Sequence, residues 1–156
     1  MKGITIPEQC HIINALAPVD IGGAAKTTDY WSMELYSHAS IIVKLGVVTN
    51  APTIKIYESD DLSGTNKTFI AFDYYAEITA AGDILTVRTA ATVAGYTFPA
   101  TTNNVMISIE IDASQLTDGY PCMALLTDNA AACLIDVSVI LSGAKYQREI
   151  TPTAIA

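Results

Sequence analysis

The chain has 156 residues, of which 51% are hydrophobic and only 15% are charged, and its formal net charge is −8. This length fits one domain with a substantial core. The acidic balance and the scatter of the eight basic residues argue against nucleic-acid binding. No apolar run approaches the ~20 residues of a membrane helix, so no membrane association is expected. A chain that is this apolar is expected to bury part of its surface against partner proteins, which predicts an oligomer or an assembly component.

Residues 1–28 are expected to form an extended N-terminal arm. Pro7 and Pro18 interrupt its apolar pieces, and residues 21–28 are small and flexible in character. Residues 10–16 are compatible with a short strand. The first eight residues place a proline and an acid where the apolar part of a secretory signal would be, so no such signal is expected.

Short segments with a period of two follow, within a predicted domain at 29–147. The alternation is weak at 30–36 and clear at 41–47 and 53–57, and it continues in the aromatic-rich segment 69–78 and at 85–87. Such alternation indicates strands with one buried and one wet face. Separations of about 8–15 residues, marked by Gly, Pro, Asn and Asp, predict a sandwich or barrel rather than βαβ units.

Residues 105–147 carry the clearest pattern. Two runs alternate apolar residues with mostly polar ones, and their apolar positions are Val105, Ile107, Ile109, Ile111, Ile135, Val137, Val139 and Leu141. A turn at 118–121 leads into the apolar run 121–126 between them. Three strands in a row predict a meander within an all-β, antiparallel β-sandwich of about eight strands. The uncharged tail at 148–156 would fray alone but could add a strand to a neighbour's sheet edge.

Few residues could carry chemistry. The acidic segment 58–61 could hold Ca²⁺, although its spacing does not match an EF-hand and a solvated turn is the alternative. His38 has Ser37 and Ser40 nearby, but there is no nucleophile elbow, and residues adjacent on a strand point to opposite faces. We therefore expect no enzyme, no cofactor and no metal site.

The cysteine pattern does not indicate a disulfide framework or a zinc site. Cys10, Cys122 and Cys133 are odd in number and have no short spacing. Buried free thiols are expected, and a Cys122–Cys133 bridge stays open as the alternative.

Five aromatic residues gather in neighbouring segments: Tyr57, Phe69, Phe72, Tyr74 and Tyr75. Exposed rings would suit sugar stacking, whereas core packing is the commoner use of aromatics. Phe69 and Phe72 fall on opposite faces of an ideal strand, so at least one of them is expected in the core.

Several strand and turn segments, spread over most of the chain after residue 18, resemble those of a known protein family. These segments are 19–23, 38–47, 54–61, 72–77, 111–121 and 140–147. Together they resemble a family of small virion proteins of tailed bacteriophages, and capsid decoration (cement) proteins fit best. The resemblance implies a jelly-roll-like sandwich that binds the major capsid protein on the capsid exterior, as a homotrimer made in the host bacterial cytoplasm. A head-fibre, tail or adhesin module that recognises a host surface glycan is the alternative.

In a decoration protein, the arm and the tail are the candidate contacts with neighbouring proteins. The residues expected to bind partners are Ile4, Ile6, Ile12, Ile13, Trp31, Tyr146, Ile150 and Ile155.

Overall fold

The computed structural model describes residues 5–77, 84–100, 103–128, 133–145 and 154–155. Two short helices are present, α1 (Ile6–Gln9) and the 3₁₀ helix η1 (Ala113–Gln115). The strands are β1 (His11–Asp20), β2 (Lys26–Thr27), β3 (Trp31–Ser32), β4 (Tyr36–Val48), β5 (Thr53–Ser59), β6 (Lys67–Ile70), β7 (Phe72–Ala76), β8 (Thr89–Ala91), β9 (Tyr96–Thr97), β10 (Val105–Asp112), β11 (Cys122–Thr127) and β12 (Cys133–Ala144).

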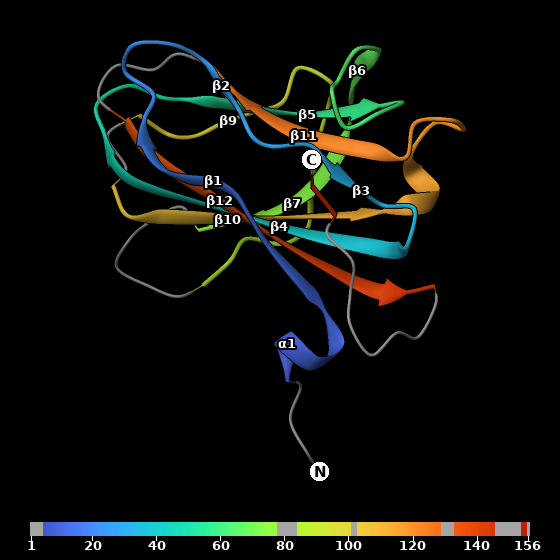
Figure 1. Cartoon of the computed structure of the whole chain (residues 1–156). Coiled ribbons are helices and arrows are strands. Elements are labelled where there is room, and N and C mark those ends of the chain that lie inside the picture. The colour runs from blue at the N-terminus through green and yellow to red at the C-terminus, as the bar shows by residue number, and fades with distance from the viewer. Residues whose placement is uncertain (1–4, 78–83, 101–102, 129–132, 146–153, 156) are drawn as a thin grey trace.

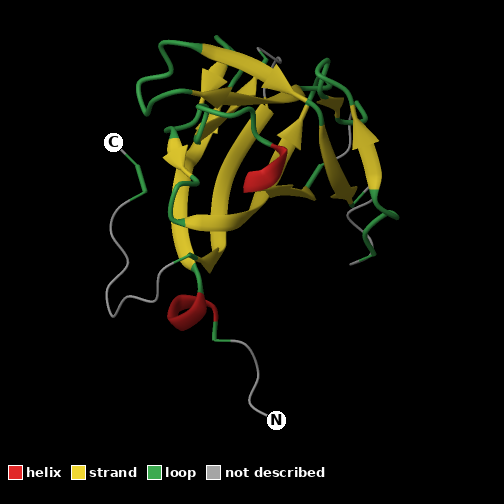
Figure 2. Ribbon diagram, turned by 90° about the vertical axis from the view of Figure 1, so that its right-hand side faces the viewer, coloured by secondary structure: helices red, strands yellow, loops and turns green. Residues whose placement is uncertain are grey.

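The strands form two antiparallel sheets that pack face to face (Figures 1 and 2). Sheet A has the order β1-β12-β4-β10-β7-β8, and sheet B has the order β2-β11-β5-β6, with β3 also paired to β11 and β9 to β5. Eight of these strands form the framework: β1, β2, β4, β5, β6, β10, β11 and β12. When they are counted from one to eight in chain order, strands 1, 8, 3 and 6 lie side by side in sheet A. Strands 2, 7, 4 and 5 lie side by side in sheet B. This is a jelly roll, so the predicted antiparallel, jelly-roll-like sandwich is confirmed.

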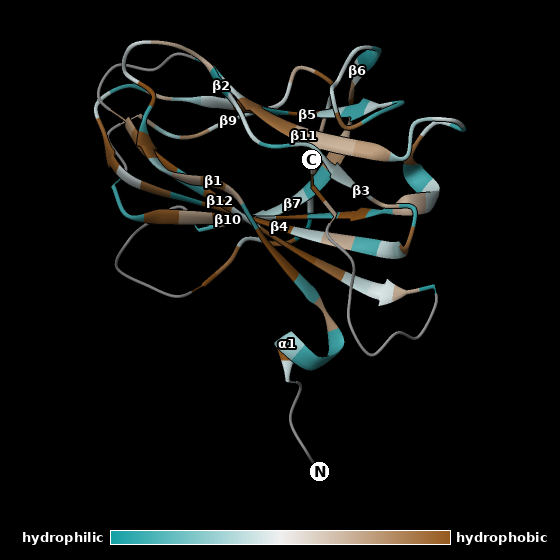
Figure 3. Cartoon of the chain, in the orientation of Figure 1, coloured by the Kyte–Doolittle hydropathy of each residue, from teal (hydrophilic) through white to brown (hydrophobic). Residues whose placement is uncertain are grey.

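The core lies between the sheets and is built from the alternating residues of the long strands. All eight apolar positions predicted in 105–147 are buried, from Val105 to Leu141. Ile54 and Ile56 of β5 and Met123 and Leu125 of β11 close the core from sheet B, each with no exposed surface. Figure 3 shows these hydrophobic residues along the central strands. The long strands of both sheets therefore supply one common apolar core.

The predicted meander is wrong. β10 and β12 do not neighbour β11 but flank β4 on its two sides in sheet A, while β11 lies in sheet B. The turn region after β10, which includes η1, carries the chain across to the other sheet. Period-two alternation fixes which side of a strand is buried, but not which strand lies beside it.

Two predicted strands also differ from the structure. The aromatic segment 69–78 splits at Ala71 into β6 in sheet B and β7 in sheet A. Residues 84–88 form no strand, and Val87 is 84% exposed there. The alternation at 85–87 is too short to distinguish a strand from a loop.

The predicted arm at 1–28 is wrong over most of its length. β1 forms the edge strand of sheet A, paired with β12, and Ile13, Ala15 and Ile21 are buried. Irregularities in the register between Asn14 and Val19 accommodate Pro18, which an edge strand tolerates. The sandwich therefore begins at β1 instead of residue 29, and only the part before it stands apart.

Part of the predicted tail at 148–156 packs on the chain itself. Ile155 forms an isolated antiparallel bridge with Trp31, and the Ser32 amide donates to the Ala154 carbonyl at 2.8 Å. Ala154 is buried. Residues 146–153 and 156 lie outside the described residues.

Candidate functional site

The residues expected to bind partners separate into three groups. Ile13 and Trp31 are 3% and 0% exposed, so they belong to the core and the expectation that they contact partners is wrong. The sequence could not show this, because β11 and the C-terminal Ile155 pair with Trp31 only in the tertiary structure. Ile155 is partly buried against the same strand. Ile4, Tyr146 and Ile150 lie outside the described residues.

Among the members of that set that the structure describes, Ile6 and Ile12 face solvent. The helix α1 stands away from the two sheets (Figure 2) and buries none of its own residues. Ile6 on this helix is 41% exposed, and Ile12, near the start of β1, is 52% exposed. We call residues 5–12 the N-terminal segment. It presents two isoleucines whose exposed apolar surface is not covered by the described residues.

The outer face of sheet A carries a hydrogen-bonded set of polar side chains. Cross-strand register places His38 opposite Asp112 and Ser40 opposite Glu110. The His38 ring nitrogens Nδ1 and Nε2 lie 2.7 Å from Asp112 Oδ1 and 2.8 Å from Glu110 Oε2. Ser40 Oγ donates to Glu110 Oε2 at 2.6 Å, and Ser108 Oγ donates to Glu110 Oε1 at 2.5 Å. We call these five residues the polar ladder.

The polar ladder favours the cationic form of His38. Partial burial alone would lower the pKa of His38, but its hydrogen bonds to Asp112 and Glu110 and their negative charges outweigh burial, so the pKa is raised above 6.5. When both ring nitrogens donate to carboxylates, the ring has no lone pair left to accept a proton. Ser40 Oγ also lies 3.4 Å from His38 Nε2, but its shorter contact, at 2.6 Å, is the hydrogen bond that it donates to Glu110, so the arrangement does not favour activation of this hydroxyl by His38.

Two more ion pairs lie on or beside the same outer face. Lys44 Nζ lies 2.9 Å from Asp136 Oδ2, and Arg88 pairs with Asp73 through two of its nitrogens. Each of the three basic groups of this face, His38 included, thus has a carboxylate partner. The face is electrostatically satisfied within the chain.

The acidic segment 58–61 does not gather its carboxylates around one point. Glu58 is 2% exposed and accepts hydrogen bonds from the Thr117 amide at 2.8 Å and the Thr117 hydroxyl at 2.6 Å. Asp61 accepts from Ser63 and Thr65, whose hydrogen bonds lower its pKa. The segment is a self-capped turn between β5 and β6. Among the residues that the structure describes, no three His, Cys, Asp or Glu side chains are placed to hold a metal ion.

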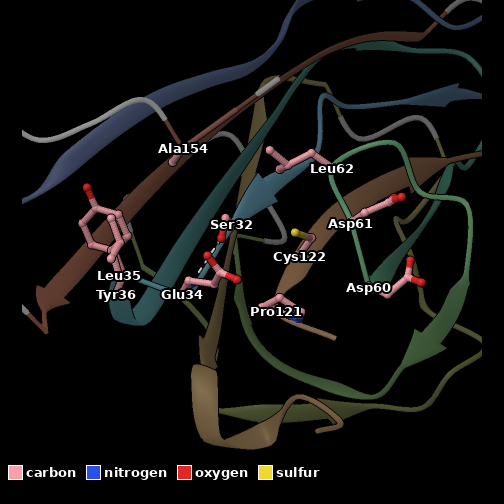
Figure 4. A pocket seen from close by; sticks show the side chains of 10 residues that line it. All are labelled: Ser32, Glu34, Leu35, Tyr36, Asp60, Asp61, Leu62, Pro121, Cys122 and Ala154. Atoms are coloured by element: carbon pink, nitrogen blue, oxygen red, sulfur yellow. Dashed lines mark hydrogen bonds between the residues drawn. The ribbon is translucent and has the colours of Figure 1, made fainter. Parts of the chain in front are cut away.

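A cavity of about 340 Å³ lies beside Cys122. Figure 4 shows Glu34, Asp60 and Asp61 around it, with Ala154 of the C-terminal residues at one side. Burial, and then the charge of Glu34, raise the pKa of Cys122. The group is therefore a protonated thiol, which is a poor nucleophile and a poor metal ligand.

The cysteines are not bridged. Cys10, Cys122 and Cys133 are all free. Cys122 begins β11 in sheet B and Cys133 begins β12 in sheet A, so the open alternative of a bridge between them does not occur. Burial, and then the charge of Asp20, raise the pKa of Cys133.

Of the five aromatic residues, Phe72 and Tyr74 lie on the core side of sheet A, Tyr75 faces outward from that sheet, and Tyr57 and Phe69 lie on the outer face of sheet B. Phe72 is buried and Phe69 is only partly buried, so the expectation that at least one lies in the core is confirmed, although they lie on different strands and not on opposite faces of one strand. Tyr57 and Phe69 stack with their ring centroids 4.2 Å apart. The ammonium groups of Lys67 and Lys55 lie 4.9 Å from the Tyr57 centroid and 5.0 Å from the Phe69 centroid, respectively. We call these four residues the ring–lysine patch.

Sequence reasoning missed both the polar ladder and the ring–lysine patch. Alternation at 53–57 does place Lys55 and Tyr57 on one wet face, and alternation at 105–111 does the same for Ser108 and Glu110. The partners of both groups come from other strands, so only the register of the sheets brings them together.

No described helix is both long enough and apolar enough to cross a bilayer. No family model and no curated protein sequence matches the chain. The solved structures with similarity include the SPBc2 prophage-derived protein YomS, 14% identical, which covers 91% of this chain and 100% of that one at a TM-score of 0.43. Desmodium yellow mottle tymovirus is 11% identical over 96% and 97% of the two chains, at a TM-score of 0.27. The CBM22-1–GH10 modules of Clostridium thermocellum xylanase 10B are 14% identical over 94% of this chain and 28% of that one, also at 0.27. At these scores the similarities carry no argument about function, which has to rest on the chain's own residues.

Proposed function

We propose that the protein is a structural component of a bacteriophage virion and that it decorates the outer surface of the capsid. The observation that carries the proposal is the exposed apolar surface of the N-terminal segment, in which Ile6 lies on the helix α1 that leaves the sandwich and Ile12 lies at the start of the edge strand β1. The sequence resemblance to small virion proteins of tailed phages supports it. In this role the jelly roll is the rigid body, and the segment binds the major capsid protein.

A capsid-bound subunit benefits from a rigid body and a projecting contact. Many weak contacts act together on a lattice, because each bound copy lies across a joint between neighbours. Burying one isoleucine side chain contributes about 1.5–3 kcal/mol, so two exposed isoleucines per copy suit a contact that is repeated many times. We also propose that the protein forms a homotrimer around a local threefold axis of the capsid. The proposal includes synthesis of the protein in the host cytoplasm and no nucleic-acid or membrane partner.

The alternative, an adhesin-type module that binds a host glycan, needs an aromatic ring with an open face. Tyr57 and Phe69 are the stacked pair on the outer face of sheet B, but each ring covers the other and a lysine lies over each. This arrangement does not favour stacking against a sugar ring, so the decoration role is preferred.

The test uses capsid shells that lack this protein. Replacing Ile6 and Ile12 together by serine is expected to weaken cosedimentation with the shells at least tenfold, which corresponds to about 1.4 kcal/mol. The matched control is Ile84→Ser, since Ile84 is 80% exposed on a loop away from the N-terminal segment. Equal binding of the wild type and the double variant would rule out the segment as the contact. Failure of the wild type to bind any shell would rule out decoration.

A further inference from the structure

Two lysines on the outer face of sheet B have no carboxylate partner, although the chain is strongly acidic. The four ion pairs found among the described residues, at a limit of 4.0 Å, involve His38, Lys44 and Arg88, and neither Lys55 nor Lys67 takes part in one. The chain has 16 acidic residues against eight basic ones. Lys26 and Lys145 likewise take part in none of these four ion pairs, but Lys55 and Lys67 differ in that their ammonium groups lie over two rings stacked on each other.

Aromatic rings hold these two cations in place. Ile54 and Ile56 point into the core, so Lys55 and Tyr57 point outward from β5. Phe69 lies opposite Tyr57 in the register with β6 and stacks on it. A ring under an ammonium group attracts and orients it but does not neutralise its charge. The lysines are therefore partly ordered before any partner arrives, which lowers the entropy cost of binding.

The position of the ring–lysine patch also suits an extended peptide. β6, which carries Lys67 and Phe69, is the outermost strand of sheet B beside β5. The outer edge of such a strand presents backbone donors and acceptors that an added strand can use. The lysines supply charge attraction beside that edge.

We propose that the ring–lysine patch docks a carboxylate-bearing, extended segment of a partner protein. The unpaired ammonium groups select for acidic side chains by charge complementarity, and the edge strand favours a polypeptide. Identification of that partner as the major capsid protein rests on the proposed function. The docking chemistry itself does not depend on it.

The first experiment measures retention on immobilised poly-L-glutamate at low ionic strength, where surface charge is least screened. The wild type is expected to be retained in spite of its negative charge, and to elute as salt rises. The double variant Lys55→Glu, Lys67→Glu is expected to bind polyglutamate at least tenfold more weakly than the wild type. The affinity of the double variant Lys55→Met, Lys67→Met is expected to lie between those of the wild type and the double glutamate variant. The control Lys145→Glu makes the same type of charge change at the end of β12 and is expected to bind like the wild type.

Several outcomes would overturn the proposal. One is that the wild type is not retained on polyglutamate. Another is that Lys145→Glu weakens retention as much as the double glutamate variant does, which would show a general charge effect. Stronger retention on heparin than on polyglutamate would assign the patch to sulfated sugars instead of a protein segment. Thermal unfolding of each variant checks that binding was lost in a folded protein.

A second experiment separates this proposal from the proposed function. The same variants are tested for cosedimentation with capsid shells lacking the protein, and the double glutamate variant is expected to bind at least tenfold more weakly. If the wild type binds polyglutamate but no shell, the patch stands and decoration fails. If the wild type and the double variant bind shells equally, the patch is not the capsid contact.

Discussion

On the outer face of sheet A the basic groups His38, Lys44 and Arg88 each have a carboxylate partner, whereas on the outer face of sheet B Lys55 and Lys67 lie over aromatic rings without one. Both faces come from the same kind of strand with the same alternation. The difference lies in what the register places opposite each cation. A cation paired within the chain contributes to the domain, while an unpaired one remains available to another molecule.

The largest expected effect on stability is at Glu110, the centre of the polar ladder. Glu110→Ala removes the acceptor of His38 Nε2 and of the Ser40 and Ser108 hydroxyls, and Ser108 is only 9% exposed. Leaving partly buried donors unsatisfied is expected to lower the free energy of unfolding by about 2–3 kcal/mol. Urea unfolding measures it. The control Glu8→Ala removes an exposed carboxylate on α1 and should change stability little. Similar values for both variants would mean that the ladder is not structural.

A smaller, pH-dependent effect is expected at His38. Its folded-state pKa is raised above 6.5, so its cationic contribution to stability is complete below that pH and is lost as the pH rises through the folded-state pKa. His38→Ala should therefore cost about 1 kcal/mol at pH 5.5, discounted for partial exposure, and clearly less at pH 9. Unfolding of both proteins at the two pH values tests the sign. A loss that is equal at both, or larger at pH 9, contradicts the ion-paired arrangement.

The smallest effect is expected at the ring–lysine patch. Lys67→Met keeps the aliphatic cover of Tyr57 but removes the cation, and an exposed cation–π contact contributes about 0.5–1 kcal/mol. The free energy of unfolding should change by no more than this, measured by the same urea titration. A loss as large as that of Glu110→Ala would show that Lys67 is part of the domain's own stability, and the contrast between the faces would disappear.

The sequence predicted the fold class because alternation is a local signal. The runs 105–111 and 135–141 each place four apolar side chains on one side, and the structure buries all of them. Local signals were misleading at the N-terminus, where two prolines and a run of small residues predicted an arm. β1 is part of the sandwich there because β12 pairs with it, and that pairing joins residues as distant as His11 and Leu141.

The candidate sites show the same limit more strongly. Ile6 and Ile12 are expected to bind partners, and their exposure is compatible with that prediction. Trp31 is expected at the edge of the core or at a subunit contact, and the structure places it in the core. It is buried because β11 and the C-terminal Ile155 flank β3. Composition gives the amount of apolar surface but not where the chain covers it.

By itself, the sequence determined an acidic, apolar, antiparallel β domain in which alternate residues of each strand face a common core. Only the tertiary structure decided which cations are neutralised, because register brings Glu110 and Asp112 to His38 and brings Phe69 to Tyr57 and Lys55. The physical reason is the range of the interactions. Side-chain direction along a strand repeats every two residues, whereas charge pairing across strands depends on contacts between residues far apart in the chain.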